Sequence, residues 1–271
     1  MIRRHVADRF YLIAQNDHAL LSGQVAAHYG NHRFTRPNPA TETLRAASLH
    51  DCGWPLHDER PTLNNEDFPL DVFETPLHLA LQVWRASADQ TAAQADYTQL
   101  LVSLHVLGLS AFAASHPHTP REVFELNQFQ QREVERQEAL RQRLSLRTDL
   151  PLHTGLAERN SDPAEQQLKR NHHILQFADR ISLSLCCTQL VTPRIDNVVP
   201  RPGDRPTTLH LRRMTDQCLV VEPWPFDQPL LNLAVPYRSV PAQRFPSPQD
   251  FVAAYAQSPV QRLEFTLRPP T

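Results

Sequence analysis

The spacing of apolar residues changes once along this chain, and that change most constrains what the chain can fold into. Up to about residue 190, apolar residues recur every three or four positions, as in the helical pattern of residues 16–29. Later they alternate, as in "LLNLAVPY" at 230–237 and "RLEFTL" at 262–267. We therefore expect a mainly α protein, a helical bundle with a small C-terminal antiparallel β region packed on it.

Prolines and capping residues subdivide this expected fold. The sequences "TPRE" at Thr119 and "DPAE" at Asp162 each place an N-cap residue before a first-turn proline and a glutamate, so each predicts a helix start. Residues 92–114 are apolar nearly all round, which favours a helix at the centre of the bundle. We expect a helical domain at 1–190, a Pro-rich connection at 191–208 and a β-rich region at 209–271.

Charge and cysteine content exclude several classes of partner. The net charge is −2 and the pI is about 6.7, so no basic field attracts nucleic acid or an anionic membrane. No run approaches the roughly 18 apolar residues that span a bilayer, and charged residues interrupt the first 21 residues where a signal peptide is apolar. The four cysteines lack paired spacing, which is typical of a reduced, cytoplasmic protein.

The stretch "SLHDCGWPLHDER" at 48–60 carries two His-Asp pairs. Adjacent His50 and Asp51 point about 100° apart around a helix, so both can face one ion only where a helix ends. Gly53 and Pro55 supply that end. We expect the first pair to bind metal, and the second pair to lie in a loop, where Asp58 orients a ligand, contacts substrate or caps the next turn.

Other candidate ligands lie in apolar helical segments. His18 falls at the start of the first long helix, and His105 lies among leucines and valines. Asp179 lies on the last large helix, and His172, seven residues earlier, shares its face. Taken singly, a histidine in such a segment is more often a polar surface group or a satisfied core group than a ligand.

The order of these residues resembles the H…HD…D motif of the HD-domain superfamily of metal-dependent phosphohydrolases. More narrowly, the segments "QNDHALLSG", "HDCGWPLHDE", "LVSLH" and "DRISL" resemble a bacterial family of unknown function related to HD domains, over roughly residues 10 to 190. The resemblance implies an HD-domain-like helical bundle. It also implies one metal ion held by His18, His50, Asp51 and Asp179, and a second ion completed by His105 and His172.

The resemblance implies hydrolysis of a phosphoester in a small-molecule substrate. One or two divalent transition-metal ions (Fe, Mn, Ni or Zn) suit the mixed imidazole and carboxylate set, with metal-bound hydroxide as nucleophile and Asp51 as the catalytic carboxylate. Many HD enzymes place a lysine where this chain has Trp54. An indole there fits an apolar or planar substrate group, and Arg60, Arg170 and Arg180 are candidates for the missing charge.

Two other functions are compatible with the same residues. One is a di-iron oxygenase on the same scaffold, and the other is a non-catalytic ligand-binding or sensing protein of HD ancestry. Iron content and oxygen uptake distinguish the first, whereas the second holds no stoichiometric metal and turns over no phosphoester. Whether the chain forms a homo-oligomer is left open by the sequence.

Overall fold

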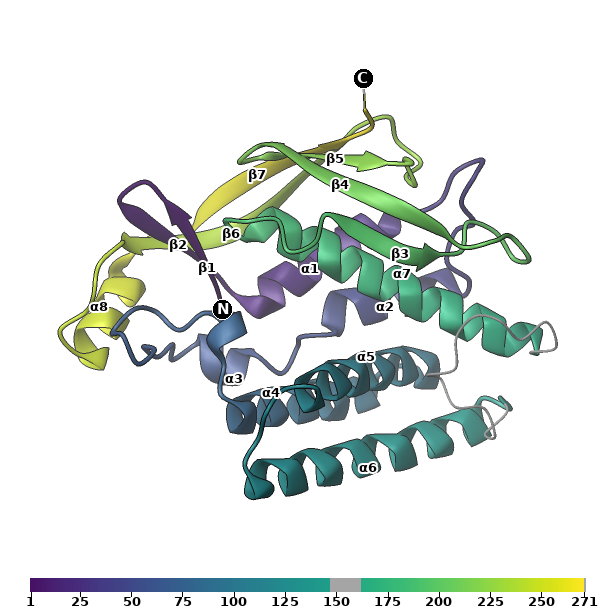
Figure 1. The fold of residues 1–271 in the computed structure, drawn as a ribbon, viewed down its shortest axis with the longest axis horizontal. Coiled ribbons are helices and arrows are strands. Elements are labelled where there is room, and N and C mark those ends of the chain that lie inside the picture. Colours follow the sequence, from purple (N-terminus) through teal and green to yellow (C-terminus); the bar gives the residue numbers. More distant parts are fainter. Residues whose placement is uncertain (147–161, 271) are drawn as a thin grey trace.

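The computed structural model describes residues 1–146 and 162–270, and these form a large curled sheet stacked on layers of helices (Figure 1). The sheet lies over α1 and α7, and α2, α4, α5 and α6 follow on their other side (Figure 1). The helices are α1 (Gln15–Ala27), α2 (Ala40–Leu49), α3 (Pro55–Asp58), α4 (Leu77–Gln90), α5 (Asp96–Ala114), α6 (Pro120–Arg143), α7 (Pro163–Cys186) and α8 (Pro248–Gln257), with the 3-10 turns η1 (Val72–Glu74) and η2 (Thr91–Ala93).

The sheet has seven strands in the order β1-β2-β6-β7-β5-β4-β3. Only the β5–β7 pair is parallel, and every other neighbouring pair is antiparallel. The strands are β1 (Ile2–Val6), β2 (Arg9–Ile13), β3 (Arg194–Val198), β4 (Thr207–Thr215), β5 (Cys218–Glu222), β6 (Leu231–Pro241) and β7 (Gln261–Arg268).

The expectation of a mainly α bundle with a small β region is wrong. The described residues are about 49% helix and 20% strand, and the strands form one mixed sheet of seven. Two strands, β1 and β2, come from the first 13 residues, and β3 lies inside the segment expected to be a connection. The β1–β2 hairpin escaped detection because its strands are short and because Ala7, not glycine, takes the left-handed conformation of its turn (φ 51°).

A buried arginine in this hairpin anchors α7 to the sheet. Arg4, 2% exposed, donates to the carbonyl oxygens of Leu185 (2.5 Å) and Cys187 (3.2 Å) at the end of α7, and also to that of Asp216. Arg213 of β4 donates to the carbonyl oxygen of Cys187 as well (3.2 Å). These cations satisfy carbonyl groups that a helix end leaves without partners, and they complement its dipole.

One continuous core joins the helices to the sheet. Buried residues of α1, α5 and α7 share a cluster with inward-facing residues of β4, β6 and β7. Contrary to the expectation that no run approaches membrane-spanning length, α5 is long and apolar enough to cross a membrane by length and composition, but 61% of its most apolar window is buried inside the protein. Packing at the centre of the helices therefore accounts for its composition.

The expected helix starts at Thr119 and Asp162 are confirmed. Thr119 forms a full capping box with Glu122, and the Asp162 side chain accepts from the backbone N–H of Ala164 (3.1 Å). The expected loop for the second His-Asp pair is wrong. Pro55 begins the short helix α3 instead, because proline is tolerated in the first turn of a helix, where its missing N–H is not needed.

Gly53 holds the turn between α2 and α3 against α4. Its N–H donates to Ser87 Oγ (2.9 Å), and a Cβ at this position would lie 2.3 Å from the Val83 carbonyl oxygen and 2.6 Å from the Ser87 backbone nitrogen. Both close atoms belong to backbone, which cannot move aside as a side chain can. Only glycine therefore fits between the turn and this helix.

The substitution Gly53→Ala is expected to lower the free energy of unfolding by about 1–3 kcal/mol, because the added methyl group forces the turn away from α4. Gly108→Ala is the matched control, since its Cβ would meet only the Gln176 side chain at 3.8 Å. In the interior of α5 this control is expected to stabilise the protein by about 0.5–1 kcal/mol. Urea denaturation measures both, and an unchanged midpoint for Gly53→Ala would contradict the close approach.

Candidate metal centre

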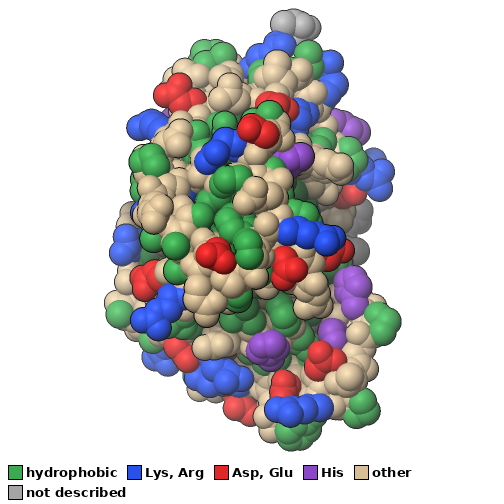
Figure 2. Space-filling view, turned by 90° about the vertical axis from the view of Figure 1, so that its left-hand side faces the viewer, with side chains coloured by type: hydrophobic (Ala, Val, Ile, Leu, Met, Phe, Trp, Pro, Cys, Tyr) green, Lys and Arg blue, Asp and Glu red, His purple; other side chains and the backbone are tan. Residues whose placement is uncertain are grey.

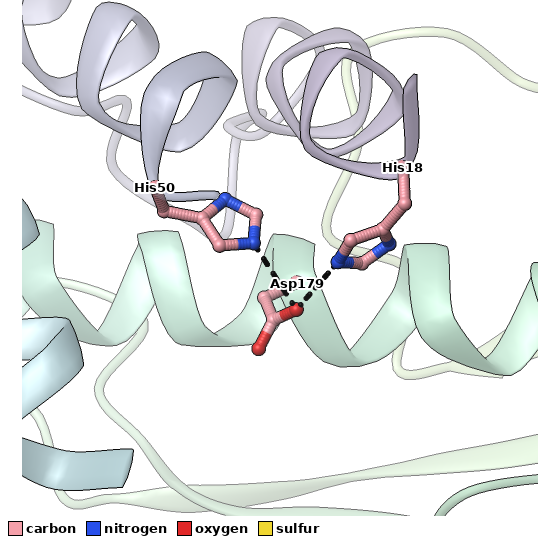
Figure 3. Close-up of side chains that lie close together, drawn as sticks. All are labelled: His18, His50 and Asp179. Atoms are coloured by element: carbon pink, nitrogen blue, oxygen red, sulfur yellow. Dashed lines mark hydrogen bonds and ion pairs between the residues drawn. The ribbon is translucent and has the colours of Figure 1, made fainter. Parts of the chain in front are cut away.

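Four side chains from three helical regions converge in the interior. His18 comes from α1, His50 from the residue that ends α2, and Asp179 from the middle of α7 (Figure 3). Asp51 follows His50 in the turn before α3. All four are buried, with at most 9% of each residue exposed. Residues more than 160 positions apart in the sequence thus meet at one point.

The ligand atoms of His18, His50 and Asp179 all lie within 4.8 Å of one another, and Asp51 lies beside the two histidines but outside this group. His18 Nε2 lies 3.0 Å from Asp179 Oδ1, and His50 Nε2 lies 3.5 Å from the same oxygen. Asp51 Oδ2 is 3.6 Å from His50 Nε2 and 4.0 Å from His18 Nε2. Ligands about 2.0–2.2 Å from a transition metal are separated from one another by roughly 3–3.5 Å. The arrangement needs only small shifts to hold an ion.

Hydrogen bonds behind the two rings direct their Nε2 atoms inward. His50 Nδ1 donates to the carbonyl oxygen of Ala47 (2.8 Å). Ser182 Oγ lies 3.1 Å from the Asp179 carbonyl oxygen, to which it donates, and 2.6 Å from His18 Nδ1. The Asp179 carboxylate can only accept, so His18 Nε2 donates to its Oδ1 (3.0 Å). A metal ion at this point would replace the proton on each Nε2, while the contacts of the Nδ1 atoms keep both rings turned inward.

The buried carboxylates of the site favour a positive charge beside them. Burial alone lowers the pKa of His50, but the Asp51 and Asp179 carboxylates outweigh it and raise that pKa to about 9. Burial likewise opposes ionisation of Asp179, yet His18 and His50 hold its pKa well below the ordinary value. Burial raises the pKa of Asp51. A proton on His50 thus occupies, without a metal, the charge position that an ion would fill.

His105 borders this cluster from α5. Its ring lies edge-on to that of His50, with centroids 4.9 Å apart, and its buried Nδ1 has no hydrogen-bond partner among the described residues. Burial, together with the neighbouring charge of His50, lowers the pKa of His105 to about 3, so the ring is neutral. A buried nitrogen without a partner costs free energy, which a bound ligand or water would recover.

A cavity of about 420 Å³ opens above the cluster. His18, Asp51, His105 and Asp179 form its floor, and its walls come from α4, α5 and the segment around η1. Its size is that of a small-molecule site. The further lining residues are Gln15, Trp54, Val72, Phe73, Thr75, Leu77, Ala80, Trp84, Leu109, Phe112, Ala113, His116, His118 and Leu183.

The remaining candidates from the sequence fall in different places. Trp54 is buried and lines the cavity. Asp58 does not line it and instead accepts from the Met1 amino group (2.9 Å) and the Gln15 backbone N–H (2.6 Å), which fixes the start of α1. Arg180 is exposed, and His172 lies two turns before Asp179; neither lines the cavity. Among the described residues, no cluster of ligand atoms joins His105 to His172.

Sequence reasoning missed two polar residues of the site. Gln15 lines the cavity, and in the part of the chain that the structure describes no group hydrogen-bonds to its buried Oε1. Its position three residues before His18 places it on the same helix face, and this spacing was the available signal. Ser182, three residues after Asp179, offered the same signal on α7. Serine and glutamine are common on helices, so the spacing alone did not single them out.

Comparison with known proteins gives a family without an assigned activity. The chain matches the family described as "Protein of unknown function (DUF3891)" over residues 1–242, a range that contains the whole site and every strand except β7. No curated protein and no solved structure matches the chain. The relation to the HD-domain superfamily stays a prediction from the motif order. Because the match covers most of its length, the chain belongs to the DUF3891 family.

Proposed function

We propose that this protein is a metal-dependent hydrolase that cleaves a phosphoester bond in a small molecule. The observation that carries the proposal is the convergence of two imidazole Nε2 atoms and two carboxylate oxygens beside a cavity that His18, Asp51 and Asp179 line. A purely structural cluster would not need ligand spacing, inward-directed Nε2 atoms and open space above them at once. All three are present.

The proposed ligands are His18, His50, Asp51 and Asp179, and they suit Mn, Fe, Ni or Zn better than Mg or Ca, which prefer oxygen alone. Such an ion supplies a Lewis acid for a phosphoryl oxygen and lowers the pKa of a coordinated water. The proposal requires one ion, because the described residues offer one cluster of ligand atoms. A second ion, and with it the di-iron oxygenase, has no comparable support.

Side chains around the proposed ion would transfer a proton, bind water or substrate, and exclude bulk water. Asp51 faces both the ligand histidines and the cavity, and burial raises its pKa, which suits a carboxylate that takes a proton from the attacking water. Gln15 presents an unpartnered amide oxygen at the cavity wall, where it can accept a hydrogen bond from water or substrate. Trp54 and Trp84 line the same space and limit entry of bulk water.

Metal content tests the proposed ligands. Protein purified without a metal-affinity tag is expected to hold about one equivalent of Fe, Mn, Ni or Zn. His50→Ala and Asp179→Ala are expected to lose it, because each removes a ligand atom. His32→Ala, which removes an exposed histidine, should keep it. Elemental analysis decides. A wild type that holds no ion and cannot be reloaded would favour the non-catalytic ligand-binding function instead.

Loss of the Asp51 carboxylate is expected to abolish most activity. With a panel of phosphoesters, Asp51→Asn should lower kcat by about 10²–10⁴-fold, the usual effect of removing a group that transfers a proton. Asp8→Asn, at an exposed aspartate, is the matched control. Metal content measured on the same samples separates loss of the ion from loss of proton transfer. Equal kcat for both variants would contradict the role of Asp51.

Metal binding is expected to strengthen as pH rises from about 6 to 8. Because the pKa of His50 is raised to about 9, an ion that binds in this range must displace its proton. One displaced proton changes the apparent affinity by about tenfold per pH unit. Competition with a chelator whose own pH dependence is known measures the effect. An affinity independent of pH would show that His50 is not a ligand.

A further inference from the structure

We infer that the substrate at this centre carries a single negative charge on its phosphoryl group and a flat apolar group beside it, as an aryl phosphodiester does. This inference rests on the proposed function and narrows it. Two features of the cavity carry it: the charges of the residues that line it, and the aromatic side chains that form its walls and mouth.

The lining residues provide little positive charge for a substrate. Asp51 and Asp179 are acidic, and among the described residues no lysine or arginine lines the cavity. The two carboxylates offset the charge of a divalent ion. The remaining groups able to carry positive charge at the mouth are His116 and His118, and His118 already lies 3.9 Å from Glu122. The two negative charges of a phosphomonoester would therefore be only partly balanced in this cavity. The single negative charge of a phosphodiester would be balanced.

The walls present aromatic surface from several elements. Trp54, 3% exposed, lies in the turn before α3. Trp84 belongs to α4, and the centroid of its ring lies 6.1 Å from that of the Phe129 ring. Phe73 of η1 and Phe112 of α5 stand at the mouth, 63% and 69% exposed. Large exposed aromatic side chains beside a cavity mark surface that gains free energy when a ligand covers it.

The outer surface agrees with this description of the mouth. Figure 2 looks at the end of the helical layers where α5 ends and α6 begins, and histidine and hydrophobic side chains lie side by side on its lower half. The His116 ring packs edge-on against that of Phe112, with centroids 5.0 Å apart. Imidazole and aromatic edges thus frame the entrance, and a cavity of about 420 Å³ behind them accommodates a phosphoryl group with its ring.

Binding of three phosphonates to the metal-loaded protein, measured by calorimetry at about pH 8, tests the inference without turnover. Phenyl phenylphosphonate has one charge and two rings, methyl methylphosphonate has one charge and no ring, and phenylphosphonate has two charges and one ring. The first is expected to bind at least about tenfold more tightly than either of the others. Equal or tighter binding of phenylphosphonate, or of the methyl compound, would overturn the inference.

The variant Trp84→Ala tests the wall, because Trp84 lies outside the proposed ligand set. Its metal content should match the wild type, while phenyl phenylphosphonate should bind about tenfold more weakly and the methyl compound equally well. Phe124→Ala removes an exposed ring of α6 that does not line the cavity and should change nothing. If Trp84→Ala does not fold, Phe73→Ala at the mouth provides the same comparison; unchanged binding in the folded variant overturns the inference.

The outcomes distinguish the inference from the function on which it rests. A protein that takes up no ion overturns both. A metal-loaded protein that binds phenyl phenylphosphonate selectively but hydrolyses no phosphoester overturns the hydrolase and keeps the ligand class. A metal-loaded hydrolase that prefers phenylphosphonate, or that cleaves monoesters faster than aryl diesters, overturns this inference alone.

Discussion

The contact of one buried carboxylate with two histidines is the constraint on which this structure depends. Asp179 lies in the interior, 3.0 Å from His18 Nε2 and 3.5 Å from His50 Nε2, and a charge there is stable only with a positive partner. The three residues belong to α1, α7 and the end of α2, so their contact fixes how these elements meet. Protonation of His50 can supply the positive charge, and a metal ion can supply it more strongly.

Two arginines of the sheet help to position the helix that carries Asp179. Arg4 of β1 and Arg213 of β4 hold the carbonyl end of α7, the helix that carries Asp179. Gly53 sets the depth of the turn that carries Asp51 against α4. The catalytic proposal therefore rests on elements at both ends of the sequence, because strands β1 and β4 hold the end of the helix that carries Asp179.

The sequence allowed the helices to be located better than the sheet. The starts of α6 and α7 follow from local capping residues, whose hydrogen bonds form within a few positions, and these were confirmed. Strand pairing depends on distant partners: β2 pairs with β6, more than 200 residues later. Five-residue strands such as β1 leave too short an alternation to recognise, so the mainly α expectation failed where the information was not local.

The candidate site was partly accessible to sequence reasoning. The order of His18, His50-Asp51 and Asp179 pointed to these residues, and the structure brings them together, although their role as ligands stays a prediction. The cavity was not foreseeable, because tertiary packing alone decides that Trp84 and Phe112 face it. The role of Asp58 was also not predictable, since its hydrogen bonds with Met1 and Gln15 depend on how the N-terminal hairpin folds back.

The most direct test of this account is a crystal structure of the metal-loaded protein with anomalous scattering recorded at the absorption edge of its ion. The account predicts one ion bound by Nε2 of His18 and His50 and by oxygens of Asp51 and Asp179, at about 2.0–2.2 Å. An ion held elsewhere, or no ion between these side chains after saturation with metal, would contradict it.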